Sequence, residues 1–556
     1  MNHGWNYRRE HLRLQQRSHY VITNGGDLCR RATRASGHYF RETNYDTVKN
    51  LWDIGDKMAE GAALMTNTEW SSRVLGVAWP SCMNRTLAET IFANIQTVGL
   101  PKWTEADETL AKATQRELGV PENGLAKQIA TSLRGTELIP DETKRGGGSD
   151  DIGDISWTVP TASLSFPANF QAGPGHNWAN AIAMATPIAH KGTVAGAKVQ
   201  AMTVIDSVTR PRRGQGRQWT ISTTLKQRWY TSFLRPGDEP AIHLNKAIMD
   251  RYRPEMRSLL LRQDLTRRTS ISSLTSSGSP IRPCARNPPR REVRRVGRRD
   301  RISFRGETPL GSRESGVGSR ESGVGSRESE CCRDDEEDTR RARCGHGDAA
   351  GPGGTPAGRA SGRESGPPRR PSIRASRVLK DLVDAEVSSP ALFDLGQQMN
   401  DMLFSFGEIG FQEFETQKYL GTLLRGQGFT VEEGVAGIPT ARGAGAAASP
   451  SSRSASDIDG IPQGSQKPGV AYHDPLVEGA PGHGEGHNSG TPLNIVAAIA
   501  VKRVMEREKL PGTLMIWPGV AEELLGTKAY YVRAALQGRR CRALQPRGLE
   551  PVHELG

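Results

Sequence analysis

The chain has 556 residues, of which 35% are hydrophobic and seven are cysteine, and its formal net charge at pH 7 is +13. This length allows two to four domains, and the low hydrophobic content indicates that part of the chain does not fold. Scattered cysteines exclude a disulfide framework. No apolar run has the length of a leader or a membrane span, so we expect a cytoplasmic protein without a membrane partner.

The first 262 residues show the periodicity of a folded region. Apolar positions recur at helical spacing in two stretches, and a third helix is expected after Thr104. The predicted elements are helices over 45–64 and 87–98, the helix after Thr104, a strand pair over 155–166, and helices over 180–189 and 242–257.

Residues 263–375 are predicted to be a disordered linker. Ser, Arg, Gly and Pro dominate, and a seven-residue repeat starting at Gly311 has one apolar residue and two glycines per copy, so it cannot bury a face. The excess positive charge belongs mainly to this segment. It does not favour a nucleic-acid partner, because Phe304 is the one aromatic residue there on which a base could stack.

Residues 376–535 regain globular character, and 536–556 form a tail. The stretch 441–456 is so rich in Ala, Gly, Ser and Arg that we expect no strand there. The predicted elements are helices over 392–406 and 419–424, strands over 429–432 and 513–517, and helices over 492–508 and 521–533.

Two motifs in this region indicate a metal-dependent hydrolase. His483 and His487 flank Glu485 in a glycine-rich segment, which we expect to be a loop up to the helix at 492. Glu522 and Glu523 follow the carboxyl end of a buried strand, where open α/β sheets place ligands. One carboxylate could bind a metal while its neighbour takes a proton from water.

Each motif alone has a simpler interpretation. A glutamate pair at the start of a helix commonly complements the helix dipole in solvent. Histidines in a glycine-rich loop can be purely structural. Only the combination, with a strand between the two motifs, favours a metal site.

Several stretches together resemble the co-catalytic zinc amidohydrolases, the family of aminoacylases and carboxypeptidase G, and in particular the amidohydrolases of the p-aminobenzoyl-glutamate hydrolase type. The motifs are His19-Tyr-Val-Ile-Thr-Asn-Gly-Gly26, Gly175-His-Asn-Trp178, Phe406-Gly-Glu-Ile-Gly-Phe-Gln-Glu413, Pro481-Gly-His-Gly-Glu-Gly-His-Asn488 and Ala521-Glu-Glu523.

The resemblance implies an α/β fold, with a mixed sheet flanked by helices, split into two segments. Residues 376–535 resemble the N-terminal half of the catalytic domain and 46–262 its C-terminal half, while 1–45 resemble a remnant of an α+β lid or dimerisation domain.

The resemblance also implies roles for individual residues. Glu522 would be the general base. Glu485, His487 and Glu523 would bind metal together with His176 from the other half, and Arg41 would grip the substrate carboxylate. Two zinc ions are expected, with manganese as the alternative. The implied substrate is a small N-acyl or N-aroyl amino acid such as p-aminobenzoyl-glutamate, and a homodimer is a candidate assembly.

The chain departs from the family pattern in several places. The two halves occur in reversed order, and a linker of roughly 110 residues spans on the order of 55–60 Å, enough to let them meet. Part of the lid is missing, and beyond Arg533 the expected metal-ligand histidine is absent, because His553 comes too late. A catalytically impaired remnant of the family is therefore the alternative to an active amidohydrolase.

Overall fold

The computed structural model describes residues 18–23, 36–41, 45–79, 81, 83–131, 150–170, 175–209, 230–260, 373–446, 451–536 and 552–554. The chain divides into one compact unit of Met1–Thr269 with Gly362–Gly556 and a second of Ser270–Ser361. All described residues belong to the first unit. The linker predicted over 263–375 lies outside the described residues, except that 373–375 already belong to a helix. The predicted domain boundaries stay predictions.

Three of the five helices predicted in the first segment are present as α2 (Tyr45–Thr66), α3 (Arg85–Val98) and α4 (Glu105–Glu117). Local signals fix where two of them start. The Asn84 side chain accepts a hydrogen bond from the Leu87 N–H at the start of α3. Thr104 and Asp107 form a reciprocal capping box at the start of α4.

The strand pair predicted over 155–166 is wrong. The chain forms a short helix α5 (Gly153–Ser156) and a three-residue strand β3 (Thr161–Ser163). Hydroxyl groups explain the difference, because Ser156 Oγ donates to the Gly153 carbonyl at 2.7 Å and Thr158 Oγ1 to the Ile155 carbonyl at 2.9 Å. Such bonds favour turns over extended backbone. The segment continues with α6 (Trp178–Ala181), α7 (Pro187–Thr209) and α9 (Lys246–Leu260).

The second segment alternates helices and strands. Its helices are α11 (Ile373–Val387), α12 (Pro390–Phe406), α13 (Phe414–Gly426), α14 (His487–Arg507), α15 (Glu522–Leu525) and α16 (Lys528–Leu536), with a 3₁₀ turn η2 (Val435–Gly437). Its strands are β4 (Thr430–Glu433), β5 (Arg442–Ala446), β6 (Ser451–Asp457), β7 (Thr513–Gly519) and β8 (Val552–Glu554). Ser389 caps α12 and Pro390 follows at its first position.

One mixed six-stranded sheet joins the two segments, in the order β3-β8-β6-β7-β5-β4. Strands β3, β8, β6 and β7 run parallel to one another, and β5 runs antiparallel to β7 and β4. The strand β8 comes from the predicted tail and lies between β3 and β6, with His553 opposite Ala162 and Ser454.

The expectation that 441–456 contains no strand is also wrong, because β5 and most of β6 lie there. A backbone ladder forms whatever the side chains are, and small side chains let helices approach this part of the sheet closely. Gln200 of α7 donates to Ser454 Oγ at 2.9 Å, and Asn494 of α14 donates to the Ala455 carbonyl at 2.8 Å.

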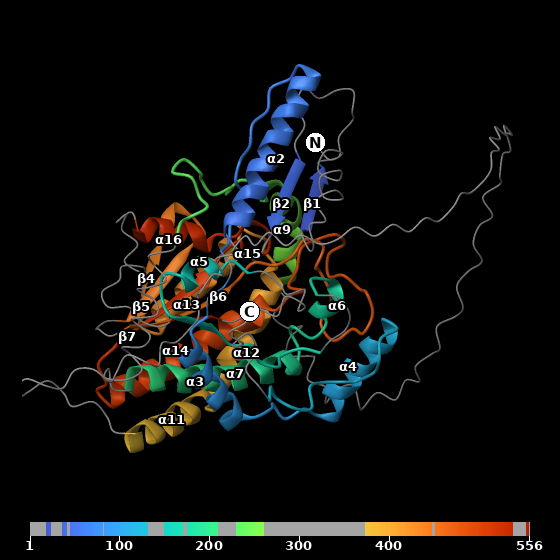
Figure 1. The fold of residues 1–556 in the computed structure, drawn as a ribbon. Coiled ribbons are helices and arrows are strands. Elements are labelled where there is room, and N and C mark those ends of the chain that lie inside the picture. The colour runs from blue at the N-terminus through green and yellow to red at the C-terminus, as the bar shows by residue number, and fades with distance from the viewer. Residues whose placement is uncertain are drawn as a thin grey trace, which may run out of the picture. The chain divides into compact units, whose positions relative to one another are not determined.

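The main hydrophobic core is built from both segments. It contains residues of α3 and α7 together with residues of α11, α12, α14 and β7, all buried. In Figure 1 the long helices α7 and α14 run close together, and a Cβ on Gly196 of α7 would come within 2.2 Å of the Leu493 side chain of α14. The two segments therefore share one core. The predicted α/β class is confirmed.

Strands β1 (Ser18–Thr23) and β2 (Ser36–Arg41) form a separate antiparallel pair. Figure 1 shows them next to α2. The helix packs on β2, because a Cβ on Gly55 would meet the Phe40 ring at 2.4 Å. That this region is the remnant of a lid stays a prediction.

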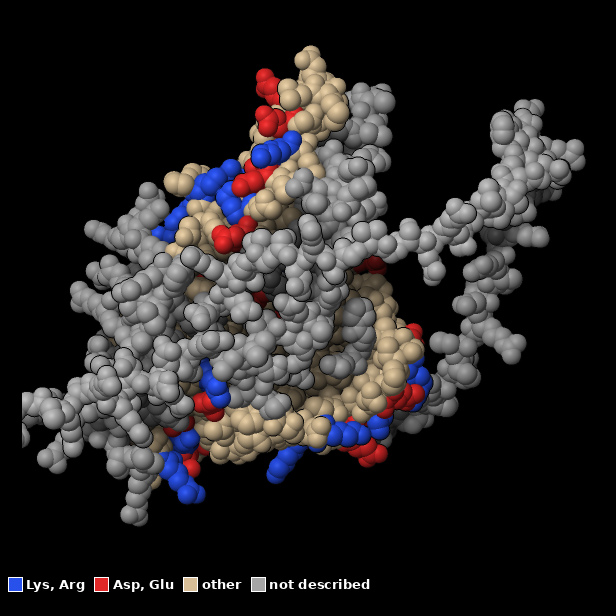
Figure 2. Space-filling view, in the orientation of Figure 1, with Lys and Arg blue, Asp and Glu red and all other residues tan. Residues whose placement is uncertain are grey.

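None of the helices in the described part has both the length and the apolar character to span a membrane. On the face shown in Figure 2, basic and acidic side chains are interspersed along α2 and along the opposite edge. Several form exposed pairs within one helix, such as Arg85 with Glu89 at 2.9 Å.

Candidate metal centre

The site lies where β6, β7 and α14 meet. Ligand atoms of Glu485, His487 and Glu523 all lie within 4.8 Å of one another, so three residues of the predicted ligand set form one cluster. The expected loop up to residue 492 is wrong, because α14 begins at His487 directly after Gly486, whose φ is 142°. The alternating glycines of this motif end at Gly486, and α14 contains Gly490 as its one glycine.

The His487 ring is oriented by a contact behind the cluster. Its Nδ1 lies 2.9 Å from the backbone carbonyl of Asp459, which accepts a hydrogen bond from it. Its Nε2 lies 3.0 Å from Glu485 Oε2 and 3.9 Å from Glu522 Oε2. Because the carbonyl holds the proton on Nδ1, a metal that displaces the proton of Nε2 would bind this nitrogen on the side of the carboxylates.

The two glutamates follow a left-handed residue at the end of β7. Ala521 has φ 54° and ψ 42°, and its N–H donates to Glu413 Oε1 at 2.9 Å. The N–H of Glu523 donates to Asp459 Oδ2 at 3.1 Å. The single helix predicted over 521–533 is wrong in detail, because Gly526 with φ 45° separates α15 from α16.

His176 from the first segment reaches this cluster. Its Nε2 lies 3.2 Å from Glu523 Oε2, while 61% of its own side-chain surface is exposed. Its backbone is also left-handed, with φ 57°. The structure thus brings residues from both segments together, and the role of His176 as a ligand stays a prediction.

Burial shifts the titration of the acids around the cluster. Burial raises the pKa of Glu522 to about 10, with Asp151 and Asp457 adding to the effect. Burial and the charge of Asp459 raise the pKa of Glu523 to about 8, against an opposing effect of His487. Burial lowers the pKa of His487, but Glu485 and Asp459 outweigh it, so that pKa lies well above its usual value.

These shifts are what a cation site requires. Carboxylates crowded in a buried space retain protons unless a positive charge compensates them. Glu523 Oε1 and Asp459 Oδ1 are buried and have no hydrogen-bond partner among the described residues. A divalent cation would satisfy such oxygens and replace the protons, and imidazole with carboxylate oxygens suits zinc and manganese. The residues present therefore fit a metal ion.

A buried lysine adds a second link between the segments. Lys528 Nζ is 2.9 Å from both carboxylate oxygens of Asp457 and also donates to Asp151. The backbone N–H of Lys528 donates to Asp151 Oδ2 at 2.9 Å. Asp151 belongs to the first segment, so this ion triad joins both segments directly behind Glu522.

Sequence reasoning missed Asp459, Glu413 and the triad. The signal for Asp459 was Asp457-Ile-Asp459, two acids at the carboxyl end of β6, but the small polar residues of that strand hid it. His483, which flanks the predicted motif, is not one of the clustered ligands; it is fully buried, and burial lowers its pKa to about 3. Arg41 ends β2 with an exposed side chain, and its substrate-binding role stays a prediction.

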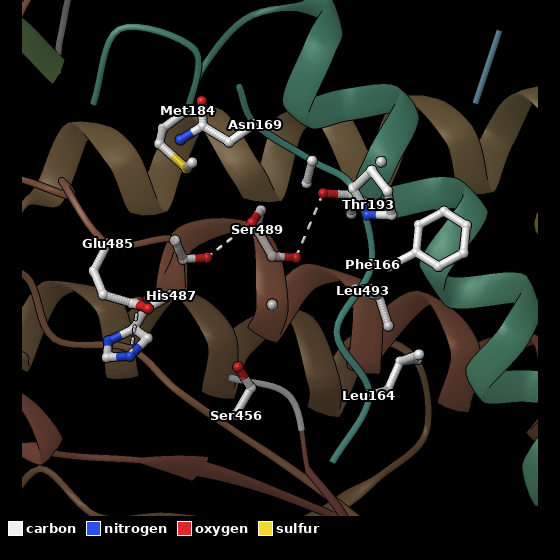
Figure 3. Close-up of a pocket in the computed structure, with 15 residues that line it drawn as sticks. Leu164, Phe166, Asn169, Met184, Thr193, Ser456, Glu485, His487, Ser489 and Leu493 are labelled. Atoms are coloured by element: carbon white, nitrogen blue, oxygen red, sulfur yellow. Dashed lines mark hydrogen bonds and ion pairs between the residues drawn. The ribbon is translucent and has the colours of Figure 1, made fainter. Parts of the chain in front are cut away.

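A pocket of about 260 Å³ adjoins Glu485 and His487. Both segments line it, with Leu164, Phe166 and Met184 from the first and Ser489 and Leu493 from the second. Figure 3 shows the Glu485–His487 pair at one end of this space and the Phe166 and Leu164 side chains at the other.

Comparisons with known proteins show which proteins this chain is similar to. No protein-family model matches the chain. A curated Escherichia coli protein, one of the subunits of p-aminobenzoyl-glutamate hydrolase, is 30% identical over 227 residues, which cover 37% of this chain and 47% of the relative. The chain thus matches about half of that relative's length.

Among solved structures, the chain is similar to the Bacillus subtilis YXEP protein, described as a dinuclear metal-binding peptidase of the M20 family. It is 18% identical, the match covers 29% of this chain and 43% of that chain, and the TM-score is 0.22, which is too low to support any argument. The sequence match to the Escherichia coli protein confirms the predicted similarity of this chain to p-aminobenzoyl-glutamate hydrolase.

Proposed function

We propose that this chain is a metal-dependent amidohydrolase that cleaves the amide bond of an N-acyl or N-aroyl amino acid. The observation that carries the proposal is the cluster of Glu485, His487 and Glu523, with ligand atoms within 4.8 Å of one another and, beside them, buried carboxylate oxygens that have no hydrogen-bond partner in the described part. The relationship to p-aminobenzoyl-glutamate hydrolase supports that substrate class.

In this proposal Glu485, His487 and Glu523 hold a zinc ion, with manganese as the alternative, and His176 is a further ligand from the first segment. The bound metal supplies Lewis acidity, which lowers the pKa of water and polarises a carbonyl. A second zinc ion is expected from the family. The Escherichia coli relative is one subunit of a hydrolase and therefore part of a larger assembly, and a homodimer is our proposal for this chain.

Glu522 is the residue that moves the proton in this proposal. Its Oε2 lies 3.9 Å from His487 Nε2, next to the ligand cluster, while Glu522 is not one of the clustered ligands. A carboxylate there takes a proton from water and delivers it to the leaving amine. Arg41, on the proposed lid remnant, pairs with the carboxylate of the substrate.

Metal analysis of the purified full chain together with an amidase assay tests the proposal. We expect at least one zinc or manganese per chain, and hydrolysis of p-aminobenzoyl-glutamate that a chelator abolishes and added metal restores. The matched variant His487→Ala should lose both metal and activity. Metal binding without hydrolysis of any N-acyl amino acid would instead indicate a catalytically impaired remnant. The absence of the expected metal-ligand histidine after Arg533 favours that alternative.

A further inference from the structure

The segment Phe406–Glu413 contains two buried glutamates that the proposed chemistry does not use. Glu408 caps α13, since its Oε2 accepts hydrogen bonds from the Thr416 N–H at 2.9 Å and Thr416 Oγ1 at 3.0 Å. Glu413 has no such local task. Its carboxylate is completely buried, and its Oε1 accepts from the Ala521 N–H, 108 residues away in the sequence.

The turn that Glu413 contacts has a strained backbone at Ala521. Ala521 has a left-handed backbone, with φ 54°, which a residue with a Cβ adopts only at a cost in free energy. Strain of this kind persists where surrounding contacts enforce it, and it concentrates at functional sites. Here the strained residue directly precedes Glu522 and Glu523, so its conformation sets the direction of both side chains.

The same segment also touches Ala521 through backbone packing. A Cβ on Gly410 would lie 2.8 Å from Ala521 Cα and Cβ, so only glycine allows this approach. On the other side of the turn, Asp459 Oδ2 accepts from the Glu523 N–H at 3.1 Å. The turn is therefore held between two buried carboxylates, each bonded to a different backbone N–H.

We propose that Glu413 is a positioning residue that acts through the Ala521 N–H: it holds the left-handed turn that aims Glu523 at the metal cluster and Glu522 at the reacting water. The inference rests on the proposed metal site. The acceptor oxygen is the essential feature, so a glutamine at 413 should replace glutamate, whereas an apolar residue of similar size should not.

Three variants of the full chain test this inference. Glu413→Gln keeps an acceptor for the Ala521 N–H, and Glu413→Met fills the same space without one. Glu413→Met combined with Ala521→Gly removes the acceptor but also the strain, because glycine adopts the left-handed conformation readily. Glu415→Gln is the matched control, since its side chain pairs with Arg257 instead of the turn.

The first readout is hydrogen exchange of the metal-free protein in the peptide that contains residues 519–525. Glu413→Met should speed exchange there, while Glu413→Gln and the control should leave it as in the wild type, and Ala521→Gly should not restore protection because no acceptor is present. Equal protection in Glu413→Met and wild type would overturn the inference, whatever the metal does.

The second readout is the affinity for Co²⁺, measured by its visible absorption. Loss of a contact that orients a ligand costs about 10- to 100-fold in metal affinity, so Glu413→Met should bind that much more weakly, with Glu413→Gln within about threefold of wild type and the double variant recovering part of the loss. Wild-type affinity in Glu413→Met overturns the inference alone. A wild-type chain that binds no Co²⁺ overturns both the inference and the proposed function.

Discussion

Glu522 and Glu523 are neighbours in the sequence with different surroundings. Glu523 contacts His176 through Oε2, its N–H is held by Asp459, and 5% of its side chain is exposed. Glu522 keeps 12% of its side chain exposed and lies at the rim of the cluster. Two adjacent residues can therefore have different roles, one binding a metal and the other contacting water.

Replacing Glu522 by glutamine should separate these roles. We expect kcat to fall by about 10²- to 10⁴-fold, because the general base is lost. The metal content should stay at the wild-type value, since Glu522 is not among the three clustered ligands. Kinetics with parallel metal analysis check the prediction. Full activity in Glu522→Gln would contradict the assigned role, and Glu415→Gln is the control.

Asp154 gives a prediction for stability against pH. It is fully buried, and burial raises its pKa from 3.8 to about 6, although Tyr230 and the Trp79 N–H donate to it. The folded state binds the proton more tightly than the unfolded state. The contribution of protonated Asp154 to the free energy of unfolding is therefore fully present below pH 3.8 and is lost as the pH rises through about 6.

The free energy of unfolding should accordingly fall by up to about 3 kcal/mol between pH 4 and pH 6.5 from this group alone. In Asp154→Asn, this part of the pH dependence of the free energy of unfolding should disappear. Urea unfolding of both proteins across that range measures the difference. Identical slopes for wild type and variant would show that Asp154 titrates normally in the folded protein.

At the scale of elements, the capping box of α4 makes a testable contribution. Thr104 and Asp107 satisfy each other's backbone N–H groups, and Asp107 also pairs with Lys191 of α7. Thr104→Ala should lower the free energy of unfolding by about 1 kcal/mol. Thr109→Ala, in the exposed middle of the same helix, should change it by less than about 0.5 kcal/mol. Equal effects of the two changes would argue against the cap.

Helices were predictable from the sequence because apolar spacing and capping residues are local. The predicted starts of α3 and α4 agree with the structure to within two residues. Strands β5 and β6 were missed because their Ala, Gly and Ser residues carry no period-two signal, and only the neighbouring β7 and the helices reveal their burial. A strand read from hydropathy alone needs large apolar side chains.

The same limit applies to the site. The clustered residues could be found from their chemical type and motif, and they are Glu485, His487 and Glu523. Asp459 contacts the site through its backbone carbonyl, which accepts from His487, and Glu413 contacts the site through the backbone N–H of Ala521. Both partners are far away in the sequence. Contacts of this kind depend on the fold and leave no local pattern. Ala521, whose left-handed backbone aims the site, is an ordinary alanine in the sequence.

At the scale of the whole molecule, Lys528 ties the two segments together. Its ammonium group is almost completely buried between Asp151 and Asp457. Lys528→Met should lower the free energy of unfolding by about 3–5 kcal/mol, because it leaves two buried carboxylates without their cation. Lys246→Met, which removes an exposed pair with Asp250, should cost at most about 1 kcal/mol. Denaturant unfolding of the two variants measures these changes. A small effect of Lys528→Met on the free energy of unfolding would contradict a stabilising role of this ion triad between the segments.

The central claim is that the two segments together supply one metal site, and the Co²⁺ affinity of His176→Ala tests it most directly. His176 is in the first segment and contacts Glu523 in the second. We predict that the wild-type chain binds Co²⁺, that His176→Ala weakens binding by about 10- to 100-fold and changes the absorption spectrum, and that His243→Ala does neither. Wild-type affinity and an unchanged spectrum in His176→Ala would contradict the account.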